Sequence, residues 1–358
     1  MSMKVHSFDV FDTCVSRHLA YPRDLFYALG LELCPSDLSS DERDAFAKRF
    51  RRLRIRAEKQ AYRSARPRQG ATLSDIYRHF EPPPGLVLPN AAILAAEVEL
   101  ERRNIYAVPE ILAELQRLRS EGKRLIFVSD MYLPASILSP LLVDLGVKRD
   151  GENLYVSCDA GLSKHSGRLY AHVLKQENLE PVDVLHVGDN AWADVRMPET
   201  LGITARRFQA ATLTPHERSI AGGKVSTSIQ SSTLAAFSRQ SRLAAWEQDG
   251  GAAMPLDDAI HTYITPLLIS YVAWVLEQAR GSGIKRLYFV ARDGEVMHKI
   301  ASRLQGSDPG IELRYLYGSR RAWLTPSIIR SSSTWRKLIA TPGQSNMRPD
   351  MLARIGLS

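Results

Sequence analysis

The sequence predicts an α/β protein with a doubly wound parallel sheet, a helical insertion after the first strand, and a partial second α/β module. Two observations support this fold class. Between residues 124 and 208, short apolar segments alternate with helical ones, which is typical of parallel sheets covered by helices on both faces. A long region rich in Ala, Leu, Arg and Glu separates this repeat from a first apolar segment at residues 4–11.

Five segments are predicted to be strands of this sheet: residues 4–11, 124–128, 153–157, 182–187 and 204–208. Helices are predicted between them at residues 137–145 and 168–175. Ligands of such sheets bind beyond the carboxyl ends of the strands. Three of the predicted strands end in chemically capable side chains, namely Asp9, Ser129 and Asp189. The sequence therefore predicts a functional site at this edge of the sheet.

A long region from about residue 23 to residue 117, which includes most of the insertion, is predicted to be helical, with a break at the three prolines of residues 82–84. Its residues 43–68 hold eleven Lys or Arg against two acids. Such a run is typical of a solvated helix face. A basic lid that attracts an anionic substrate is the functional alternative. Nucleic-acid binding is a weaker interpretation, because aromatic side chains are not interleaved with the basic ones as in a stacking platform.

The chain is predicted to divide into four parts: residues 1–16 with 106–212, residues 17–105, residues 213–256 and residues 257–358. The first is the sheet domain and the second the helical insertion. The third is a predicted linker, because of its Gly-Gly pair and its Ser and Thr clusters, and it has room for one short helix. The fourth is predicted to hold a helix at residues 257–280, a strand at residues 286–291, a second helix, and a second strand at residues 312–317. It has roughly 100 residues, few for a complete α/β domain, which predicts a truncated or partly shared module.

Composition indicates a cytoplasmic globular protein. Hydrophobic residues make up 44% of the chain, as expected for real cores. Three cysteines are too few and too scattered for a disulfide framework. Acidic residues interrupt the first apolar segment, so no signal peptide is expected. The apolar stretch at residues 259–279 carries His261, Pro266 and Glu277, which favours a buried helix over a membrane span.

Phosphoryl transfer is the chemistry that the strand ends fit best. It requires a nucleophile, a divalent metal ion that neutralises charge, and donors for the phosphoryl oxygens. Asp9 supplies a nucleophilic carboxylate. Asp189 supplies a ligand for Mg²⁺, a hard ion that takes one or two protein carboxylates. Asp194, five residues further, is a candidate to bind the metal ion through water or to orient Asp189.

Three groups are candidate donors to the phosphoryl oxygens. They are the hydroxyl of Ser129, the backbone N–H of Asp130 and the ammonium of Lys164, which lies in a Gly- and Ser-rich loop. Each residue alone is commonplace, since Ser and Asp often cap helices. Together, in this order and on separate strand-to-helix crossings, they favour a phosphoryl-transfer site over a purely structural explanation.

These motifs resemble those of the haloacid dehalogenase (HAD) superfamily, over about residues 4–212. The motifs are Phe8-Asp9-Val10-Phe11-Asp12-Thr13, then Ile126-Phe127-Val128-Ser129-Asp130, then Lys164, then His186-Val187-Gly188-Asp189-Asn190 with Asp194. The resemblance implies a Rossmann-like core, an aspartyl-phosphate on Asp9 and phosphoryl binding by Ser129 and Lys164. It also implies Mg²⁺ held by Asp9, Asp189, Asp194 and the backbone oxygen of Phe11, and a helical C1 cap at residues 17–105.

The C-terminal part adds a finer resemblance. Predicted HAD hydrolases encoded with bacterial surface-polysaccharide genes carry an ARDG strand end and a downstream SRRA motif. Here these are Ala291-Arg292-Asp293-Gly294 and Ser319-Arg320-Arg321-Ala322. This likeness implies the same group of hydrolases.

One position departs from the family pattern. HAD phosphatases usually place a second Asp two residues after the nucleophile as general acid and base, and here that residue is Phe11. General acid–base help is worth about 10²–10⁴ in rate. The sequence therefore predicts a slow phosphatase, a substrate with a good leaving group, or recruitment of Asp12.

Four functional hypotheses remain open. The leading one is a Mg²⁺-dependent phosphatase or phosphotransferase that acts on a small phosphorylated metabolite, such as a sugar phosphate or a nucleotide. The alternatives are a catalytically weak or regulatory module, a nucleic-acid end phosphatase, and a 2-haloacid dehalogenase, in which an aromatic residue at the Phe11 position is familiar. A dehalogenase does not need Mg²⁺, so the intact Asp189 and Asp194 disfavour it.

A further group of residues lies near the motifs or at a predicted strand end. His186 is predicted to be a buried core histidine, and Trp192 to pack against the cap. Minor substrate roles are considered for His165 and for the remaining residues of the group: Arg292, Asp293, Arg314, Arg320 and Arg321.

Overall fold

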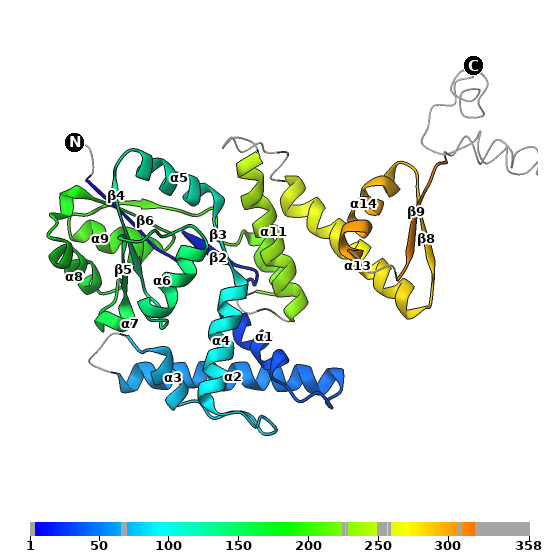
Figure 1. The fold of residues 1–358 in the computed structure, drawn as a ribbon, viewed down its shortest axis with the longest axis horizontal. Coiled ribbons are helices and arrows are strands. Elements are labelled where there is room, and N and C mark those ends of the chain that lie inside the picture. Colours follow the sequence, from blue (N-terminus) through cyan, green and yellow to red (C-terminus); the bar gives the residue numbers. More distant parts are fainter. Residues whose placement is uncertain are drawn as a thin grey trace, which may run out of the picture. The chain divides into compact units, whose positions relative to one another are not determined.

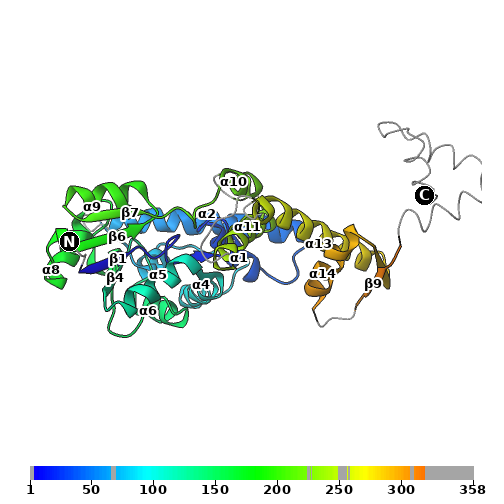
Figure 2. The same cartoon turned by 90° about the horizontal axis from the view of Figure 1, so that it is seen from above.

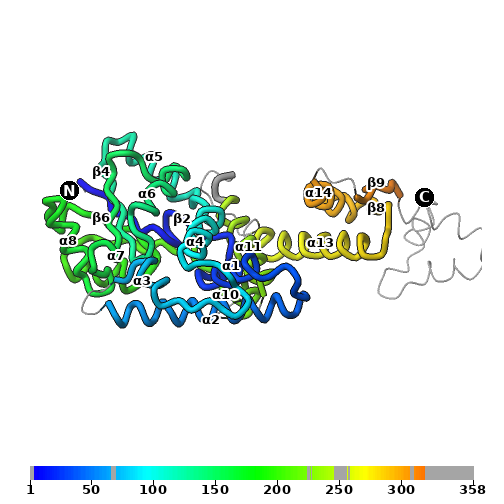
Figure 3. The backbone as a smooth tube through the Cα atoms, turned by 60° about the horizontal axis from the view of Figure 1, so that its bottom comes forward, coloured from blue at the N-terminus to red at the C-terminus, as the bar shows by residue number. Residues whose placement is uncertain are grey.

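The computed structural model describes residues 4–65, 70–223, 226, 228–248, 256, 259–306 and 310–318 of the chain (Figure 1). The chain forms two compact units, Met1–Pro266 and Leu267–Ser358, which are described separately below. We call them the first and the second unit. Figure 2 turns the same ribbon by 90°, and Figure 3 traces the backbone as a tube.

The first unit is built on a five-stranded sheet in the order β5-β4-β1-β6-β7, with every neighbouring pair parallel. The strands are β1 (Val5–Phe8), β4 (Arg124–Ser129), β5 (Asn153–Val156), β6 (Val184–Gly188) and β7 (Thr204–Arg207). The predicted α/β class and all five predicted strands are confirmed. Phe8 of β1 lies opposite Phe127 of β4 and Val187 of β6, so the carboxyl ends of three central strands meet at one edge.

Helices cover both faces of this sheet, and strand alternation decides which residues face which helices. On one face, Leu125 and Phe127 of β4 join a core with α5 (Pro109–Ser120) and α6 (Ala135–Asp144). On the other, Ile126 and Val128 join a smaller core with α8 (Arg168–Glu177). Because both faces are buried, these strands are continuously apolar rather than alternating with polar residues. Shorter helical segments are α7 (Ser157–Ala160), η1 (Pro181–Asp183) and α9 (Met197–Thr200).

The insertion consists of four helices between two short strands. The helices are α1 (Asp24–Glu32), α2 (Ser40–Ser64), α3 (Leu73–Arg78) and α4 (Asn90–Asn104). Strands β2 (Val15–Arg17) and β3 (Ile105–Ala107) pair antiparallel where the insertion leaves and rejoins the sheet domain. The prediction of one long helical region with a single break missed this strand pair. Three-residue strands are too short to show a hydrophobic period.

Helix α2 carries the basic run. Ser39 and Glu42 form a capping box at its start, and its buried face includes Phe46 and Phe50. Arg54 lies on that face, fully buried, and donates two hydrogen bonds to Glu97 of α4, at 2.8 and 2.7 Å. The basic run is therefore not purely a solvated face.

The structure differs from the predicted linker at residues 213–256. Helix α10 (Pro215–Ala221) and the 20-residue helix α11 (Ile229–Gln248) lie in the first unit, and α11 contacts α1 and α5. The Ser- and Ala-rich segment that indicated a linker forms a buried helix face instead. Its fully buried residues are Ser232, Ala235, Ala236 and Ser238. Small side chains allow such close packing.

The second unit contains a parallel strand pair between helices. Its elements are α13 (Thr265–Gly281), preceded by the π-helical turn η3 (Ile260–Ile264) of the first unit, then β8 (Arg286–Val290), α14 (Asp293–Gln305) and β9 (Glu312–Leu316). Its core includes Val272, Leu276, Phe289 and Ala301. Within the described part of the chain, no helix is long and apolar enough to cross a membrane.

Candidate active site

Asp9 stands directly after β1 and is held by the sheet. Its backbone N–H donates to the carbonyl oxygen of Val187 at 2.9 Å, which extends the ladder between β1 and β6 by one residue. The residue is 5% exposed, and the hydroxyl of Thr13 donates to its Oδ2 atom at 3.1 Å. The carboxylate is therefore positioned from both backbone and side chain.

Three carboxylates converge at this edge of the sheet. Oxygen atoms of Asp9, Asp189 and Asp194 lie within 4.8 Å of one another. Asp194 lies on a π-helical turn, η2 (Ala191–Arg196), and its Oδ2 atom accepts the backbone N–H of Asn190 at 3.0 Å. A Cβ atom on Gly188 would lie 2.5 Å from Cγ of Asp194, so only glycine at this position lets Asp194 approach.

Lys164 lies between two of these carboxylates. Its ammonium, on a side chain that is 3% exposed, donates to Oδ1 of Asp9 and, at 2.6 Å, to Oδ1 of Asp194. Its backbone N–H donates to Oδ1 of Asp130 at 2.8 Å. The carboxylate of Asp130 thus anchors the lysine loop, which is a contact that the sequence did not indicate.

The electrostatics of the cluster follow from burial and from this one lysine. Burial raises the pKa of Asp9 to about 7. The positive charge of Lys164 opposes this increase, and the negative charge of Asp194 adds to it. Burial and the charges of Asp9 and Asp12 raise the pKa of Asp189 to about 8. For Asp194, the opposing effects of Lys164 and His186 outweigh burial and hold its pKa below the ordinary value. The pKa of Lys164 is raised, because Asp9 and Asp194 outweigh its burial.

These residues fit a divalent cation. Three carboxylates face one ammonium, which leaves two negative charges when all are ionised, and oxygen ligands are those that Mg²⁺ prefers. Ser129, 2% exposed, ends the neighbouring strand β4, so its hydroxyl is at the same edge of the sheet. The structure thus brings together Asp9, Ser129, Lys164, Asp189 and Asp194 from four separate crossings.

A buried hydrogen-bonded group supports Asp194 from behind. His186, 0% exposed, has its Nε2 atom 3.2 Å from Oδ1 of Asp194 and its Nδ1 atom 2.8 Å from the hydroxyl of Ser7. The hydroxyl of Tyr170 donates to the carbonyl oxygen of Ala193 at 2.8 Å and also lies 3.3 Å from Asp194. His186 is buried as predicted, whereas sequence reasoning missed Tyr170, because nothing in a helical tyrosine marks its partner.

Phe11 and Asp12 lie in the loop after β1 and contact residues of β2 and α11. Asp12 adopts a left-handed backbone conformation (φ 56°), and its Oδ1 atom accepts the hydroxyl of Ser16 at 3.2 Å. Nη1 of Arg239 on α11 lies 3.7 Å from the same oxygen. The guanidinium of Arg17 lies over the Phe11 ring, 4.1 Å from its centroid. Asp12 is thus engaged with the start of the insertion and with α11.

A cavity of about 370 Å³ adjoins these residues. Phe11, Asp12 and Asp130 line it from the loops after β1 and β4. Arg17, Arg23 and Glu58 line it from the strand and helices of the insertion. The volume is typical of a pocket for a small molecule.

His165 and Trp192 lie together at the surface. The indole N–H of Trp192 donates to the carbonyl oxygen of His165 at 3.1 Å, and their rings are 5.9 Å apart. Trp192 is 44% exposed. Its indole contacts the lysine loop, and packing against the cap stays a prediction.

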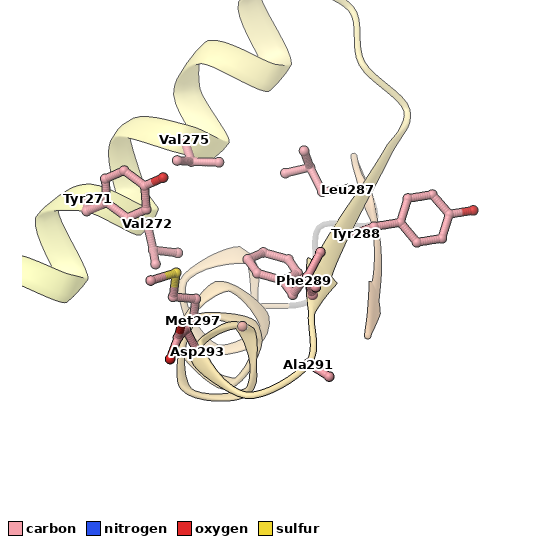
Figure 4. Close-up of a pocket in the computed structure, with 11 residues that line it drawn as sticks. Tyr271, Val272, Val275, Leu287, Tyr288, Phe289, Ala291, Asp293 and Met297 are labelled. Atoms are coloured by element: carbon pink, nitrogen blue, oxygen red, sulfur yellow. The ribbon is translucent and has the colours of Figure 1, made fainter. Parts of the chain in front are cut away.

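In the second unit, Asp293 borders a hollow of about 310 Å³ between α13 and β8, lined mostly by apolar side chains (Figure 4). Arg292 has a positive φ of 76°, and Arg314 pairs with Glu312 at 2.5 Å. Arg320 and Arg321 lie outside the described residues. The structure brings no other acidic, His or Cys side chain of the described part together with Asp293 as a metal-ligating group.

The fold and this edge of the sheet define an α/β enzyme core with a helical insertion. The chain belongs to the haloacid dehalogenase-like hydrolase family, whose profile matches residues 4–202, more than half of the chain. Membership identifies it as a HAD-like hydrolase.

Solved structures similar to this chain include two HAD enzymes and a dehalogenase. The HAD family enzyme BT-2542 from Bacteroides thetaiotaomicron is 14% identical, over 58% of this chain and 94% of its own, with a TM-score of 0.39. The HAD-hydrolase YfnB from Bacillus subtilis is 15% identical, over 59% and 88%, with a TM-score of 0.38. The L-2-haloacid dehalogenase from Xanthobacter autotrophicus is 14% identical, over 62% and 84%, with a TM-score of 0.41.

Proposed function

We propose that the protein is a Mg²⁺-dependent phosphatase or phosphotransferase that forms an aspartyl-phosphate on Asp9. The observation that carries this proposal is that the ammonium of Lys164 donates hydrogen bonds to both Asp9 and Asp194, and that the carboxylate of Asp189 lies close to those of Asp9 and Asp194. A buried ammonium between a candidate nucleophile and a candidate metal ligand can stabilise the negative charge of a phosphoryl group while that group is transferred to Asp9. The substrate would be a small phosphorylated metabolite, such as a sugar phosphate or a nucleotide.

In the first step, a carboxylate oxygen of Asp9 attacks phosphorus while the bond from phosphorus to the leaving oxygen breaks, and the leaving oxygen keeps the electron pair. The ammonium of Lys164, the hydroxyl of Ser129 and the backbone N–H of Asp130 donate to the phosphoryl oxygens. Such fixed donors stabilise developing charge without reorganisation. Water then attacks the acyl phosphate, which releases inorganic phosphate and restores Asp9.

Asp9, Asp189, Asp194 and the backbone oxygen of Phe11 would hold the metal ion. Bound Mg²⁺ neutralises charge on the phosphoryl oxygens and aligns them for in-line attack. His186 and Tyr170 keep Asp194 oriented, and Gly188 gives it space.

Proton transfer is the weak point of this site. Phe11 cannot protonate the leaving oxygen, and one oxygen of Asp12 is already engaged with Ser16. Asp12 nevertheless lines the cavity and is the candidate acid and base. We expect the Phe11→Asp variant to hydrolyse an unactivated phosphate ester faster, by up to about 10²-fold, because it restores a proton donor. Unchanged steady-state rates with glucose 6-phosphate would show that proton transfer does not limit turnover.

Hydrolysis of an aryl phosphate tests the proposal itself. The activity should require added Mg²⁺, disappear with EDTA, and fall at least roughly 10³-fold in Asp9→Asn, because the covalent route is lost. Asp37→Asn, at an exposed site on the loop before α2, is the matched control and should keep full activity. Full activity in Asp9→Asn would exclude Asp9 as nucleophile.

A 2-haloacid dehalogenase is the second candidate, and Phe11 favours it because a halide leaves without a proton. Release of halide from 2-chloropropionate without metal would support it. A catalytically weak regulatory module predicts phosphate-analogue binding without hydrolysis of any metabolite phosphate. The exposed basic residues of α2 leave open a nucleic-acid end phosphatase, for which oligonucleotide binding should weaken steeply with salt.

Two finer predictions accompany this function. The free thiols of Cys14, Cys34 and Cys158 favour a cytoplasmic location. The resemblance to HAD hydrolases encoded with surface-polysaccharide genes makes sugar phosphates the first substrates to screen.

A further inference from the structure

The charged side chains that line the cavity at Phe11, Asp12 and Asp130 differ in how they are engaged within the protein. Three acids line it, and each has a partner. Glu58 accepts a hydrogen bond from Arg54 at 3.2 Å, and Asp12 accepts one from Ser16 at 3.2 Å. Asp130 accepts the backbone N–H of Lys164 at 2.8 Å. The acids are therefore already engaged within the protein.

Arg17 and Arg23 are the two arginines that line this cavity, and Arg17 is the buried one. The residue is 4% exposed and lines the cavity from strand β2. Its Nε atom donates to Oε1 of Glu101 at 2.8 Å, and its guanidinium lies flat over Phe11 at 4.1 Å from the ring centroid. Among the described residues, neither Nη group donates a hydrogen bond to another protein atom. A buried guanidinium is thus held in place at one edge with its other donors unused.

The geometry of arginine limits what can fill this position. Once Nε is engaged, the two Nη groups form a planar fork that matches the two oxygens of a carboxylate. A single hydroxyl would occupy only one of the two donors. A ligand that accepts from both Nη groups therefore makes two charge-assisted hydrogen bonds, whereas a ligand with one acceptor makes only one.

We infer that Arg17 binds a carboxylate of the substrate, so that the enzyme prefers small phosphorylated acids, such as phosphorylated hydroxy acids or sugar acids. This inference rests on the proposed function, because the phosphoryl group would occupy the Asp9 end of the site. Arg17 and Lys164 then hold the two ends of one substrate. Two fixed anchors orient the phosphorus toward the nucleophile. Phe11, which cannot transfer a proton, serves as the platform for Arg17.

Calorimetric binding to matched ligand pairs tests this inference. One pair is 3-phosphoglycerate and glycerol 3-phosphate, and the other is 6-phosphogluconate and glucose 6-phosphate. Within each pair the carboxylate is the main difference, and the two pairs place it at different distances from phosphorus. The full chain carries Asp9→Asn to prevent turnover, and Mg²⁺ is present. We expect at least one acid to bind tenfold or more tightly than the member of its pair that lacks the carboxylate.

The Arg17→Lys variant should reduce that ratio to below threefold, because an ammonium lacks the fork. Arg103→Lys, an exposed arginine at the end of α4 that pairs with Glu32, is the matched control and should keep the ratio. Ratios near one in the parent protein, no binding of any of the four ligands, or a ratio that survives in Arg17→Lys would each overturn the inference.

Glu101→Gln provides a second variant that does not depend on the folding of Arg17→Lys. It removes the negative charge beside Arg17 and keeps an oxygen for Nε, so the preference for the acids should increase. A merely structural role of Arg17 predicts an equal or lower preference, and that result would overturn the inference.

Hydrolysis of the aryl phosphate by the chain with Asp9 intact separates this inference from the proposed function. Activity without a preference for acids overturns the inference alone. A preference for acids without activity supports the inference and counts against the phosphatase proposal.

Discussion

Asp9 in the first unit and Asp293 in the second occupy similar local positions. Each follows a strand of a parallel sheet, at the end where ligands usually bind. Asp9 is buried and lies with two further carboxylates and a lysine. Asp293 is exposed and begins a helix beside an apolar hollow.

The difference lies in the number of strand ends that meet. In the first unit, β1 has a neighbour on each side: β4 ends in Ser129, and β6 is followed directly by Asp189. In the second unit, β8 has one described neighbour, β9, which ends at Leu316. A strand-end aspartate therefore becomes part of a charged cluster only where adjoining strands supply partners that offset its burial.

Replacement of the buried Lys164 should have the largest effect on activity and stability, and it tests the difference between the two units. We expect Lys164→Met to lower kcat by roughly 10²–10³-fold, because a fixed donor to the reacting group is lost. The free energy of unfolding should fall by at most roughly 3 kcal/mol, which is the lower end of the cost of leaving a buried charge unpaired. The cost is at the lower end because Asp9 can take up a proton and become neutral.

The matched control for that variant is in the second unit. Lys299 pairs with Glu295 at 2.8 Å on an exposed face of α14. Lys299→Met should change stability by about 0–1 kcal/mol and leave activity intact. Urea denaturation and aryl-phosphate kinetics measure both variants, and similar losses in the two would contradict the distinction between the units.

Glycine substitutions should have the next largest effect. Gly188→Ala places a Cβ atom 2.5 Å from Cγ of Asp194, so that carboxylate must move. We expect a Mg²⁺ affinity about 10-fold lower, measured by calorimetry, because metal sites depend on exact ligand orientation.

Gly294→Ala in the second unit brings a Cβ atom to 2.8 Å from the backbone of Phe289. It should destabilise by about 1–3 kcal/mol, as overpacking does. It should leave Mg²⁺ binding unchanged. Loss of Mg²⁺ binding in Gly294→Ala, or its retention in Gly188→Ala, would contradict the assignment of the metal site.

Removal of a tyrosine hydroxyl should have the smallest effect on stability and kcat. Tyr170→Phe removes the hydrogen bond to Ala193 and the contact with Asp194, at a cost of about 1 kcal/mol and a few-fold in kcat. Tyr315→Phe removes an acceptor for the exposed backbone N–H of Arg292, 3.3 Å away, and should change stability by less. Thermal melts and kinetics compare the two, and an equal loss would show that burial is not the cause.

Much of the first unit could be predicted from the sequence. Buried parallel strands such as Leu125–Ser129 are continuously apolar, and polar residues at their ends are visible without a structure. The parallel sheet, its five strands and the meeting of Asp9, Ser129 and Asp189 at one edge followed from that pattern.

Other features could not be predicted, because their partners are distant in sequence. Arg54 looked like one more cation of a basic run, yet Glu97 buries and neutralises it. Helix α11 looked like a linker, yet its small side chains pack against the first unit. The three-residue strands β2 and β3 become visible only when they pair.

The sequence by itself determined the fold class and the chemical types at the strand ends, since hydrophobic period and residue identity are local properties. The tertiary structure alone decided which charges face one another. It placed Lys164 between Asp9 and Asp194, put His186 and Tyr170 behind Asp194, and left the fork of Arg17 open in a cavity. Those contacts depend on strand order and helix packing, and electrostatic energies depend steeply on distance and burial.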